Sequence, residues 1–303
     1  MTRKYGTGSS ILTKKRTGTD FLGFSMKEEI NSSEALVAYL DVLGYSNLVH
    51  QEGIGANFYH GAIDAAISRW HRFLEKHQYN WGDVVRRYTT LEVIGDAFVV
   101  VFDQERALSE EGLREDEKAL MLMVFLTLLS FLVQDCSRAV ERLFRGAVVR
   151  GKHYQREFEN LESSTFVFSR GLCDAHELAE NIADVPRILV DKSVLAGLDI
   201  SVLIMEERPD RELLRDTDGL YFLNIYSSVF CDTALAPILR EIASVVGKSM
   251  ADIKELKITQ KYIWFANYHN GVVQQIIDLS PSIPSFDEIQ RNQTSMLIEI
   301  PSL

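Results

Sequence analysis

The order of apolar segments along the chain predicts an α+β protein in which helices pack on a sheet. Three observations lead to this class: short β-branched runs of strand length, longer segments with helical periodicity between them, and Gly or Pro residues at their boundaries. Up to residue 191 the predicted order is βαββαββαβ, which is typical of a sheet covered by helices.

The first part of the predicted order is one strand, one helix and then two more strands. Residues 35–44 form a short apolar run that ends in glycine, as a buried strand entering a loop does. Residues 56–77 have the periodicity of a helix. Residues 84–102 are rich in β-branched and aromatic side chains and are interrupted by Gly95 and Asp96, so they are predicted to be two strands joined by a tight turn.

Residues 120–133 form the most apolar segment of the chain, and a polar helix start at 114–118 precedes it. The segment is shorter than the roughly 18 apolar residues of a membrane-spanning helix. A helix that is apolar nearly all round is either buried or an oligomer interface. We therefore expect a core helix here and no membrane partner.

The second half of the predicted order begins with a strand at 144–151 and a further strand around Phe166. A helix at 172–182 follows, and Pro186 separates it from a short buried strand at 187–191. The remaining predicted elements are strands at 201–206 and 219–226 and helices at 234–246 and 251–277.

Composition and charge exclude several classes of function. The 303 residues are 46% hydrophobic and 25% charged, as in a soluble globular protein of one or two domains. The net charge of −11 opposes a nucleic-acid or anionic-membrane surface, because either needs a basic patch. The first thirty or so residues are polar, without the apolar core of a signal peptide. The three cysteines are far apart in the sequence, which favours neither a disulfide framework nor a zinc site and indicates a reducing, cytoplasmic location: Cys136, Cys173 and Cys231.

Two aspartates stand at strand ends beside glycines. Asp41 closes the first predicted strand just before Gly44, and Asp96 follows Gly95 in the predicted hairpin turn. A lone Asp–Gly pair is most often a turn, but a buried carboxylate without a nearby basic residue in the sequence is costly unless something pairs with it. Two such oxygen ligands suit Mg²⁺ or Mn²⁺ bound together with substrate phosphates.

Two segments that carry these aspartates resemble the metal-binding segments of class III adenylyl and guanylyl cyclases. They are YLDVLGYSNLV at 39–49 and LEVIGDAFVVVF at 91–102, and the strand FRGAVVRG at 144–151 also fits the family's order. SRGLCDAHELAENIADVPRILVD at 169–191 and KYIWFANYHN at 261–270 are more closely similar to the pyrimidine cyclases of bacterial anti-phage (Pycsar) signalling. The resemblance covers roughly residues 35–277.

The resemblance implies a fold, an activity and an assembly. The fold would be a class III cyclase-type, ferredoxin-like sheet with helices packed on it and additional C-terminal helices. The activity would be conversion of CTP or UTP to cCMP or cUMP and pyrophosphate, as a second messenger in antiviral defence. The enzyme would be a homodimer with active sites between subunits. The domain boundaries would be a flexible arm at 1–33, a catalytic domain at 34–230 and a helical extension at 231–303.

The resemblance also implies ligands for two metal ions and for the phosphates. Asp41, Asp96 and the backbone carbonyl of Val42 would hold the two Mn²⁺ or Mg²⁺ ions, with Asp41 and Asp96 as the catalytic residues. Backbone amides of the following loop would hold phosphate oxygens. These loop residues are Leu43, Gly44, Tyr45 and Ser46.

The chain departs from the family on the predicted helix at 172–182, which precedes the Pro-Arg-Ile strand. Cys173 and Glu177 align with the transition-state Asn and Arg of the family, and neither can replace them. Another cation would have to act, or the protein binds nucleotide without turnover. The candidates are Arg87, Arg145, Arg150 and Lys261, with Arg86 and Arg87 favoured as nucleotide ligands because they precede Asp96 in the predicted hairpin.

Glu92, four residues before Asp96, aligns with the residue that reads the nucleobase in the family. A carboxylate accepts hydrogen bonds, so it favours guanine or cytosine, leaves uracil possible and disfavours adenine. A guanylyl cyclase and a catalytically inactive nucleotide-binding protein are therefore the alternatives. Among the remaining candidates, His176 and His269 are interpreted as polar helix-face residues, and Trp264 and Tyr268 as part of a helical core stripe.

Overall fold

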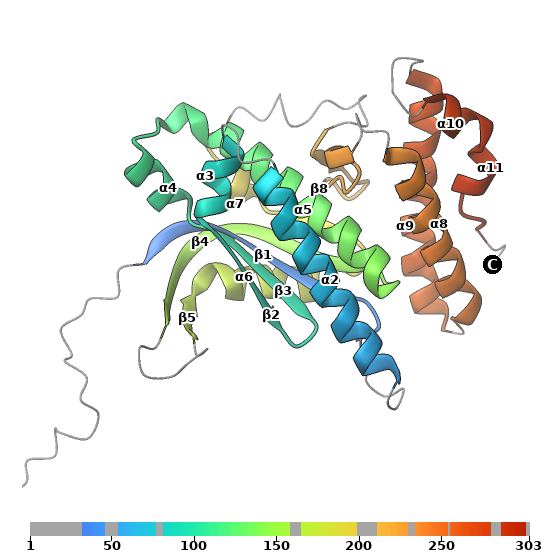
Figure 1. Ribbon diagram of the computed structural model, residues 1–303, viewed down its shortest axis with the longest axis horizontal. Coiled ribbons are helices and arrows are strands. Elements are labelled where there is room, and N and C mark those ends of the chain that lie inside the picture. The colour runs from blue at the N-terminus through green and yellow to red at the C-terminus, as the bar shows by residue number, and fades with distance from the viewer. Residues whose placement is uncertain are drawn as a thin grey trace, which may run out of the picture. The chain divides into compact units, whose positions relative to one another are not determined.

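A sheet with helices on both of its faces forms the centre of the protein (Figure 1). The structure is a computed structural model that describes residues 32–45, 54–76, 81–157, 165–198, 211–229, 234–253, 255–279 and 286–300. Residues 32–303 belong to one compact unit. The predicted α+β class is confirmed.

Four strands in the order β2-β3-β1-β4 make up the main part of the sheet, and each pairs antiparallel with its neighbour. With helical segments between β1 and β2 and again between β3 and β4, this is the ferredoxin-like arrangement. The strands are β1 (Ser33–Val42), β2 (Thr89–Ile94), β3 (Ala97–Phe102) and β4 (Phe144–Glu157).

The two faces of β1 are covered by different helices, because side chains alternate along a strand. Leu36 and Leu40 are buried in the core beneath α2 (Ile54–Lys76) and α5 (Lys118–Val140). Val37, Tyr39 and Asp41 point to the opposite face, where α6 (Arg170–Asn181) packs. The second face therefore carries the first predicted metal ligand.

Helix α5 is long and apolar enough to cross a membrane by length and composition alone, and it is the one helix of that kind in the described part of the chain. In this structure 67% of its most apolar window is buried inside the protein. Met121, Phe125 and Leu129 are fully buried between the sheet and α2. The packing agrees with the prediction of a buried helix.

Helix α6 approaches β4 closely because glycines face each other at their contact. A Cβ atom added to Gly151 would lie 2.8 Å from the Cα atom of Gly171, which is closer than any side chain allows. Ala175 and Ala179 continue the buried side of the helix. Small residues therefore bring α6 down onto the face of the sheet that carries Asp41.

The remaining strands extend the sheet, and among the remaining helices α8 packs against α5. Strand β5 pairs with β4, and β6 pairs parallel to β4 before β8 and β7 complete the edge. Their bounds are β5 (Thr165–Ser169), β6 (Ile188–Val190), β7 (Leu213–Arg215), β8 (Tyr221–Leu223), α7 (Lys192–Leu195), α8 (Leu235–Asp252), α9 (Leu256–Leu279), α10 (Phe286–Arg291) and α11 (Gln293–Met296).

One predicted strand is wrong in its first half, because the segment before β2 is the helix α3 (Trp81–Arg87). Asp83 forms ion pairs with Arg86 and Arg87 at the spacing that stabilises a helix. Val84 and Val85 pack on the helical core, and these contacts outweigh their preference for strands. A second helix that the sequence did not predict, α4 (Gln104–Glu111), follows β3.

Most of the other predicted elements are present, and β4 is longer than predicted by six residues at its end. The predicted strand at 201–206 and nearly all of the predicted arm at 1–33 lie outside the described residues. The predicted division between 34–230 and 231–303 stays a prediction.

The segment KYIWFANYHN lies in α9, where its polar groups tie the C-terminal helices to the sheet. Trp264 Nε1 donates to Asp216 Oδ2 at 3.1 Å, and the Tyr268 hydroxyl donates to Asn224 Oδ1 at 2.7 Å. Asn270 exchanges two hydrogen bonds with the backbone of Ile298. Trp264 and Tyr268 pack against the core as predicted, so this segment has a structural role in the described part of the chain.

His269 is fully buried in the same helix, whereas the sequence suggested a residue on a helix face. Its Nε2 lies 2.7 Å from the Met296 carbonyl, which accepts, so Nε2 carries the proton. Its Nδ1 then accepts from the Tyr226 hydroxyl at 2.6 Å. Burial lowers the pKa of His269 from 6.5 to about 4, against a smaller opposing effect of the Met296 carbonyl.

We expect His269 to make the protein less stable in mild acid. Its pKa is lower in the folded than in the unfolded chain, so its stabilising effect is complete above pH 6.5 and is lost as the pH falls toward 4. The loss would be about 3 kcal/mol over this range. Urea unfolding of the wild type and of His269→Gln between pH 7 and 4 measures this loss as the difference between their unfolding free energies. The carboxylates that both proteins share titrate alike and cancel in that difference. An unfolding free energy that falls with pH equally in the two proteins would contradict this prediction.

Candidate active site

Asp41 and Asp96 come together at one end of the sheet. In the register of β1 and β3, Asp41 pairs with Ala97, the residue that follows Asp96. Gly95 has a φ of 66°, which fits the first central position of the tight hairpin turn between β2 and β3. Burial raises the pKa of Asp96, and both the charge of Asp41 and a hydrogen bond with its side chain raise it further.

Arg145 on β4 is the basic residue beside Asp41 and Asp96. Its Nε donates to Asp41 Oδ2 at 2.8 Å, and its Nη2 donates to Glu180 Oε1 of α6 at 2.5 Å. The side chains of Arg145 and Asp41 are only 17% and 11% exposed, so this ion pair is largely shielded from water. The register of β1 and β4 produces the contact, since Arg145 lies directly opposite Asp41.

Tyr39 lies two residues before Asp41 on the same face of β1. Burial raises its pKa to about 12, and the charges of Asp41, Asp96 and Glu180 add to this effect while Arg145 opposes it. Its ring also contacts His176 of α6 edge to face, with 5.0 Å between the ring centres. The Tyr39 hydroxyl is therefore neutral at physiological pH and can act as a hydrogen-bond donor.

The donor set fits a divalent cation that is shared with a substrate. Three carboxylates, those of Asp41, Asp96 and Glu180, face a single guanidinium, so the site carries excess negative charge. The described residues contain no group of three His, Cys, Asp or Glu side chains arranged to hold a metal by themselves. Mg²⁺ commonly binds one or two carboxylates and completes its shell with water and substrate phosphates.

One backbone amide of the loop after β1 is hydrogen-bonded within the protein. The Leu43 amide donates to the Leu143 carbonyl at 2.9 Å, and the role of Leu43 as a phosphate ligand stays a prediction. Gly44 is exposed with a φ of 80°, which turns the backbone away from the strand. Tyr45 is half-buried against the core, and Ser46 lies outside the described residues. Gly44 and Tyr45 stay predicted phosphate ligands.

Glu92 lies on the same face of the sheet as Asp41. It pairs with Val99 of β3, which in turn pairs with Tyr39 of β1. Glu92 Oε1 accepts a hydrogen bond of 2.6 Å from Gln155 Nε2 of β4. From the strand spacing and the rise per residue, Glu92 and Asp41 are separated by about 12 Å between backbones.

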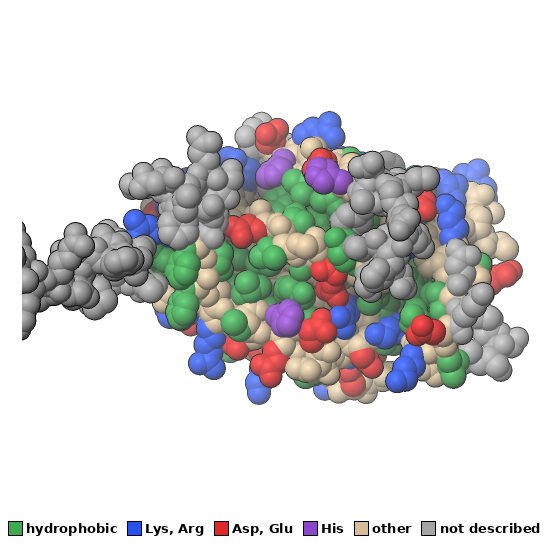
Figure 2. All heavy atoms as spheres, turned by 90° about the horizontal axis from the view of Figure 1, so that it is seen from below, with side chains coloured by type: hydrophobic (Ala, Val, Ile, Leu, Met, Phe, Trp, Pro, Cys, Tyr) green, Lys and Arg blue, Asp and Glu red, His purple; other side chains and the backbone are tan. Residues whose placement is uncertain are grey.

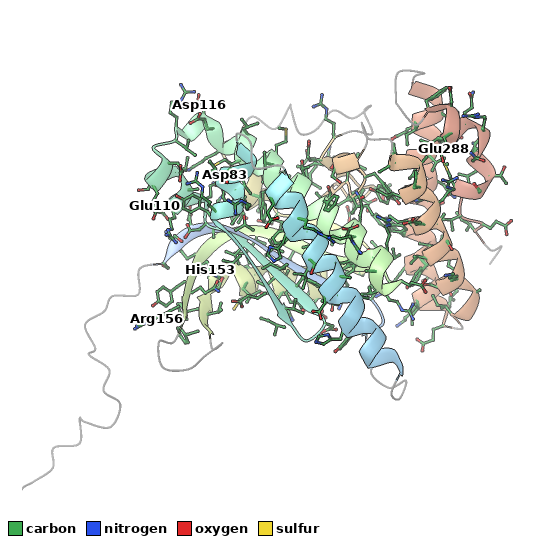
Figure 3. All side chains as sticks on the ribbon, in the orientation of Figure 1. Asp83, Glu110, Asp116, His153, Arg156 and Glu288 are labelled. Carbon is green, nitrogen blue, oxygen red and sulfur yellow. The ribbon has the colours of Figure 1, made fainter. Side chains whose placement is uncertain are left out.

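Arg86 and Arg87 do not join this site. They belong to α3, at the end of the sheet away from the hairpin tip, and six strand residues separate them from the turn, on the order of 20 Å. Arg87 makes two bonds to Glu111, of 2.7 and 3.2 Å, and both arginines pair with Asp83. Figure 3 shows Asp83 and Glu110 with α3 and α4. Their selection as nucleotide ligands followed from the wrong strand prediction at 84–88.

The other predicted cations lie elsewhere in the protein. The two residues that replace the family's transition-state Asn and Arg are exposed. The Arg150 guanidinium donates to the Val194 carbonyl at 3.1 Å, and Lys261 belongs to α9. Cys173 and Glu177 are exposed on α6. Among the four cations proposed from the sequence, Arg145 alone contacts Asp41.

Sequence reasoning missed Glu180, Tyr39 and Gln155. Tyr39 could have been found from the alternation of β1, since it faces the same side as Asp41. Glu180 lies one turn after Glu177 on α6, but only the packing of that helix against β4 shows that it reaches Arg145. Gln155 gives no signal in the sequence, because its contact with Glu92 depends on the curvature of β4.

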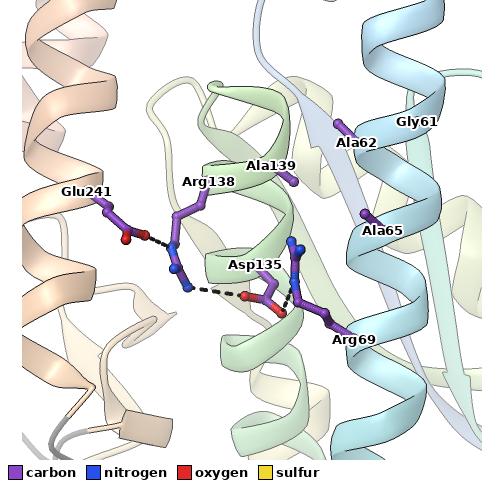
Figure 4. Close-up of a pocket in the computed structure, with 8 residues that line it drawn as sticks. All are labelled: Gly61, Ala62, Ala65, Arg69, Asp135, Arg138, Ala139 and Glu241. Atoms are coloured by element: carbon purple, nitrogen blue, oxygen red, sulfur yellow. Dashed lines mark hydrogen bonds and ion pairs between the residues drawn. The ribbon is translucent and has the colours of Figure 1, made fainter.

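A groove of about 660 Å³ lies between α2, α5 and α8 (Figure 4). Asp135, 5% exposed, lies between Arg69 at 3.1 Å and Arg138 at 3.3 Å, and Arg138 also pairs with Glu241. Two arginines and two carboxylates neutralise each other there. The groove contains none of the predicted site residues, and its ion pairs join three helices.

Comparison with known proteins finds likeness in structure only. No protein-family model matches the chain, and no curated protein matches it. The guanylyl cyclase Cya2 has 10% identity and a TM-score of 0.39 over 64% of this chain and 91% of its own. The dimeric guanylyl cyclase domain of the RhoGC fusion protein from the aquatic fungus Blastocladiella emersonii has 9% identity and a TM-score of 0.39, covering 63% and 93%.

A class III adenylyl cyclase-like ATP-binding protein from Pseudomonas aeruginosa has 10% identity and a TM-score of 0.39, over 56% of this chain and 36% of its own. These structural neighbours are nucleotide cyclase domains or cyclase-like proteins. Identities and TM-scores this low carry no weight for function, so we base the function on the residues of the site.

Proposed function

We propose that this protein is a metal-dependent nucleotide cyclase that converts a pyrimidine nucleoside triphosphate to its 3′,5′-cyclic monophosphate and pyrophosphate. One observation carries the proposal. Asp41 and Asp96, from separate strand ends, share one negatively charged site with a single arginine, and the two sequence segments around them resemble the metal-binding segments of class III cyclases.

In this reaction the ribose 3′-oxygen attacks the α-phosphorus while the bond from that phosphorus to the pyrophosphate oxygen breaks. The 3′-hydroxyl loses its proton, and pyrophosphate leaves with the electron pair of the broken bond. Asp41, Asp96 and the Val42 carbonyl would hold two Mg²⁺ or Mn²⁺ ions, which when bound make the 3′-hydroxyl more acidic and neutralise the leaving group. No side chain of the protein has to form a covalent bond to the substrate.

Arg145 is the chain's own cation at this site. Its guanidinium bridges Asp41 and Glu180, and rearrangement of the exposed Glu180 end would let it meet a phosphate oxygen. A guanidinium forms short, charge-assisted bonds to phosphate, which the missing helix arginine cannot provide here. Gly44 and Tyr45 would add backbone amides from the loop.

A homodimer is the assembly that we propose for this enzyme. Several large apolar side chains are exposed on the sheet hairpin and on β5, and the largest exposed fractions are 54% for Ile94 and 61% for Phe168. Figure 2 looks at the molecule from below Figure 1, and apolar side chains gather near the middle of that face between acidic ones. Exposed apolar patches of this kind often mark protein interfaces.

The pyrimidine base and the role in antiviral defence rest on the sequence segments at 169–191 and 261–270. Glu92 supports a base that offers a hydrogen-bond donor, which cytosine and uracil both do. The alternative of a guanylyl cyclase rests on Glu92 alone. The alternative of an inactive nucleotide-binding protein rests on Cys173 and Glu177, which replace the Asn and Arg of the family.

The test is incubation of the purified protein with Mn²⁺ and all four ribonucleoside triphosphates, followed by mass spectrometry of the products. We expect cCMP or cUMP together with equimolar pyrophosphate, and no product when a chelator removes the metal. Cyclic GMP as the main product would support the guanylyl cyclase alternative. Binding of a triphosphate without any cyclic product would refute the enzyme and leave the regulatory protein.

A further inference from the structure

Three polar side chains form a hydrogen-bonded row on the face of the sheet that α6 partly covers. Gln155 of β4 donates through Nε2 to Glu92 Oε1 of β2 at 2.6 Å. Gln155 Oε1 lies 3.4 Å from His153 Nε2 on the same strand. Figure 3 labels His153 on β4, beyond the part that pairs with most of β1. The end of β4 therefore reaches across the sheet to Glu92.

The chemistry of the three groups determines how Gln155 is oriented. A carboxylate only accepts hydrogen bonds, so the NH₂ group of Gln155 must face Glu92 and its oxygen must face His153. His153 is 7% exposed, and burial lowers its pKa, so its ring is neutral with a single N–H group. That N–H is on Nε2, where it meets the Gln155 oxygen. A flipped amide would place two donors together at one end and two acceptors at the other.

This orientation affects which base Glu92 can read. Guanine offers two neighbouring donors, N1–H and N2–H, and pairs best with both oxygens of a carboxylate. Cytosine offers its N4 amine and uracil its N3–H, and each needs only one carboxylate oxygen. Because Oε1 already accepts a short bond from Gln155, a guanine that uses both oxygens would have to share Oε1 with the Gln155 amide, whereas a pyrimidine can use Oε2 alone.

We propose that Gln155 is a specificity-determining positioning residue that occupies Oε1 of Glu92 and thereby selects a pyrimidine nucleotide over a guanine nucleotide. This proposal rests on the nucleotide-cyclase function proposed above. With Gln155 bound to Oε1, Glu92 favours a pyrimidine, whereas a free Glu92 carboxylate would pair best with guanine. The residue acts through Glu92 and leaves the metal-binding aspartates untouched.

The experiment is Gln155→Met in the full chain, with Gln290→Met as the matched control because Gln290 is exposed on α10. We expect the ratio of kcat/KM for the preferred pyrimidine triphosphate to that for GTP to fall at least about tenfold, the effect of one charge-assisted hydrogen bond. The change should be in KM, with kcat for the pyrimidine substrate within about threefold of the wild type. The control should leave both unchanged.

A second set of measurements separates this proposal from the proposed activity. Competition binding of the four triphosphates, measured alongside turnover, should show the same shift toward GTP, and the shift should vanish when Glu92→Gln is already present. A protein that binds with this selectivity but makes no cyclic product would refute the cyclase and retain the role of Gln155. An unchanged pyrimidine-to-GTP ratio in a folded, active Gln155→Met protein would overturn the role of Gln155 alone.

If Gln155→Met does not fold, Gln155→Asn provides the same test, because its side chain is one carbon shorter and withdraws the NH₂ group from Oε1. The same tenfold fall in the ratio is expected. Failure of the wild type to bind any of the four triphosphates would overturn both proposals.

Discussion

Replacing Asp96 or Asp41 by alanine is expected to lower the proposed cyclase activity by at least about a hundredfold, because in the proposed mechanism each change removes an oxygen ligand of the metals. The two carboxylates share one site, so neither can replace the other. Product formation with Mn²⁺ and the preferred triphosphate measures the effect. The control is Asp184→Ala, which removes an exposed carboxylate from the loop after α6.

The same two variants should differ in stability, which separates metal binding from folding. Two uncompensated carboxylates in one site repel each other, so removal of either one could stabilise the metal-free protein. The structure supports this for Asp96, whose pKa is raised by burial and by Asp41. We expect Asp96→Ala to be neutral or to gain up to about 1 kcal/mol in unfolding free energy at neutral pH.

Asp41→Ala should instead lose about 1–2 kcal/mol, because it leaves the shielded Arg145 with only the more exposed Glu180 as its partner. Urea unfolding without metal checks both signs. An Asp96 or Asp41 variant that keeps more than a few per cent of the activity, with an unchanged circular dichroism spectrum, would show that this aspartate is not needed for turnover.

The predicted fold succeeded where one pattern dominated a segment. The short apolar run of β1, the β-branched run of β3 and the long apolar run of α5 are patterns strong enough to identify these elements without tertiary information. The prediction failed at α3, where valines suggested a strand. There the Asp83 ion pairs and the burial of Val84 and Val85 against the helical core determine the conformation.

The predicted site was incomplete for a physical reason. Asp41 and Asp96 could be selected because each stands between apolar residues at a strand end and therefore appears in the linear sequence as a costly carboxylate. The partners of these residues depend on strand register and helix packing: Arg145 lies opposite Asp41 only in the pairing of β1 with β4, and Glu180 reaches it only when α6 lies on β4. Such contacts join residues far apart in the chain, and periodicity contains no information about them.

Mixing Asp96→Ala and Glu92→Ala subunits should restore activity if each active site takes its metal ligands from one subunit and its base-reading residue from the other. Glu92 lies about 12 Å from Asp41, the other proposed metal ligand of the site that contains Asp96, and the Glu92 side chain is hydrogen-bonded to Gln155. In a two-fold symmetric dimer of this kind, a heterodimer has one site with both changes and one site with neither. Random exchange makes about half of all dimers heterodimers, so activity should recover to about a quarter of the wild type.

Exchange would be driven by partial unfolding and reassociation and confirmed by native mass spectrometry. Asp96→Ala mixed with Asp41→Ala would serve as the control that cannot recover. Activity equal to the sum of the two parents, in a sample where heterodimers are present, would mean that Glu92 acts with Asp96 of its own subunit or does not read the base.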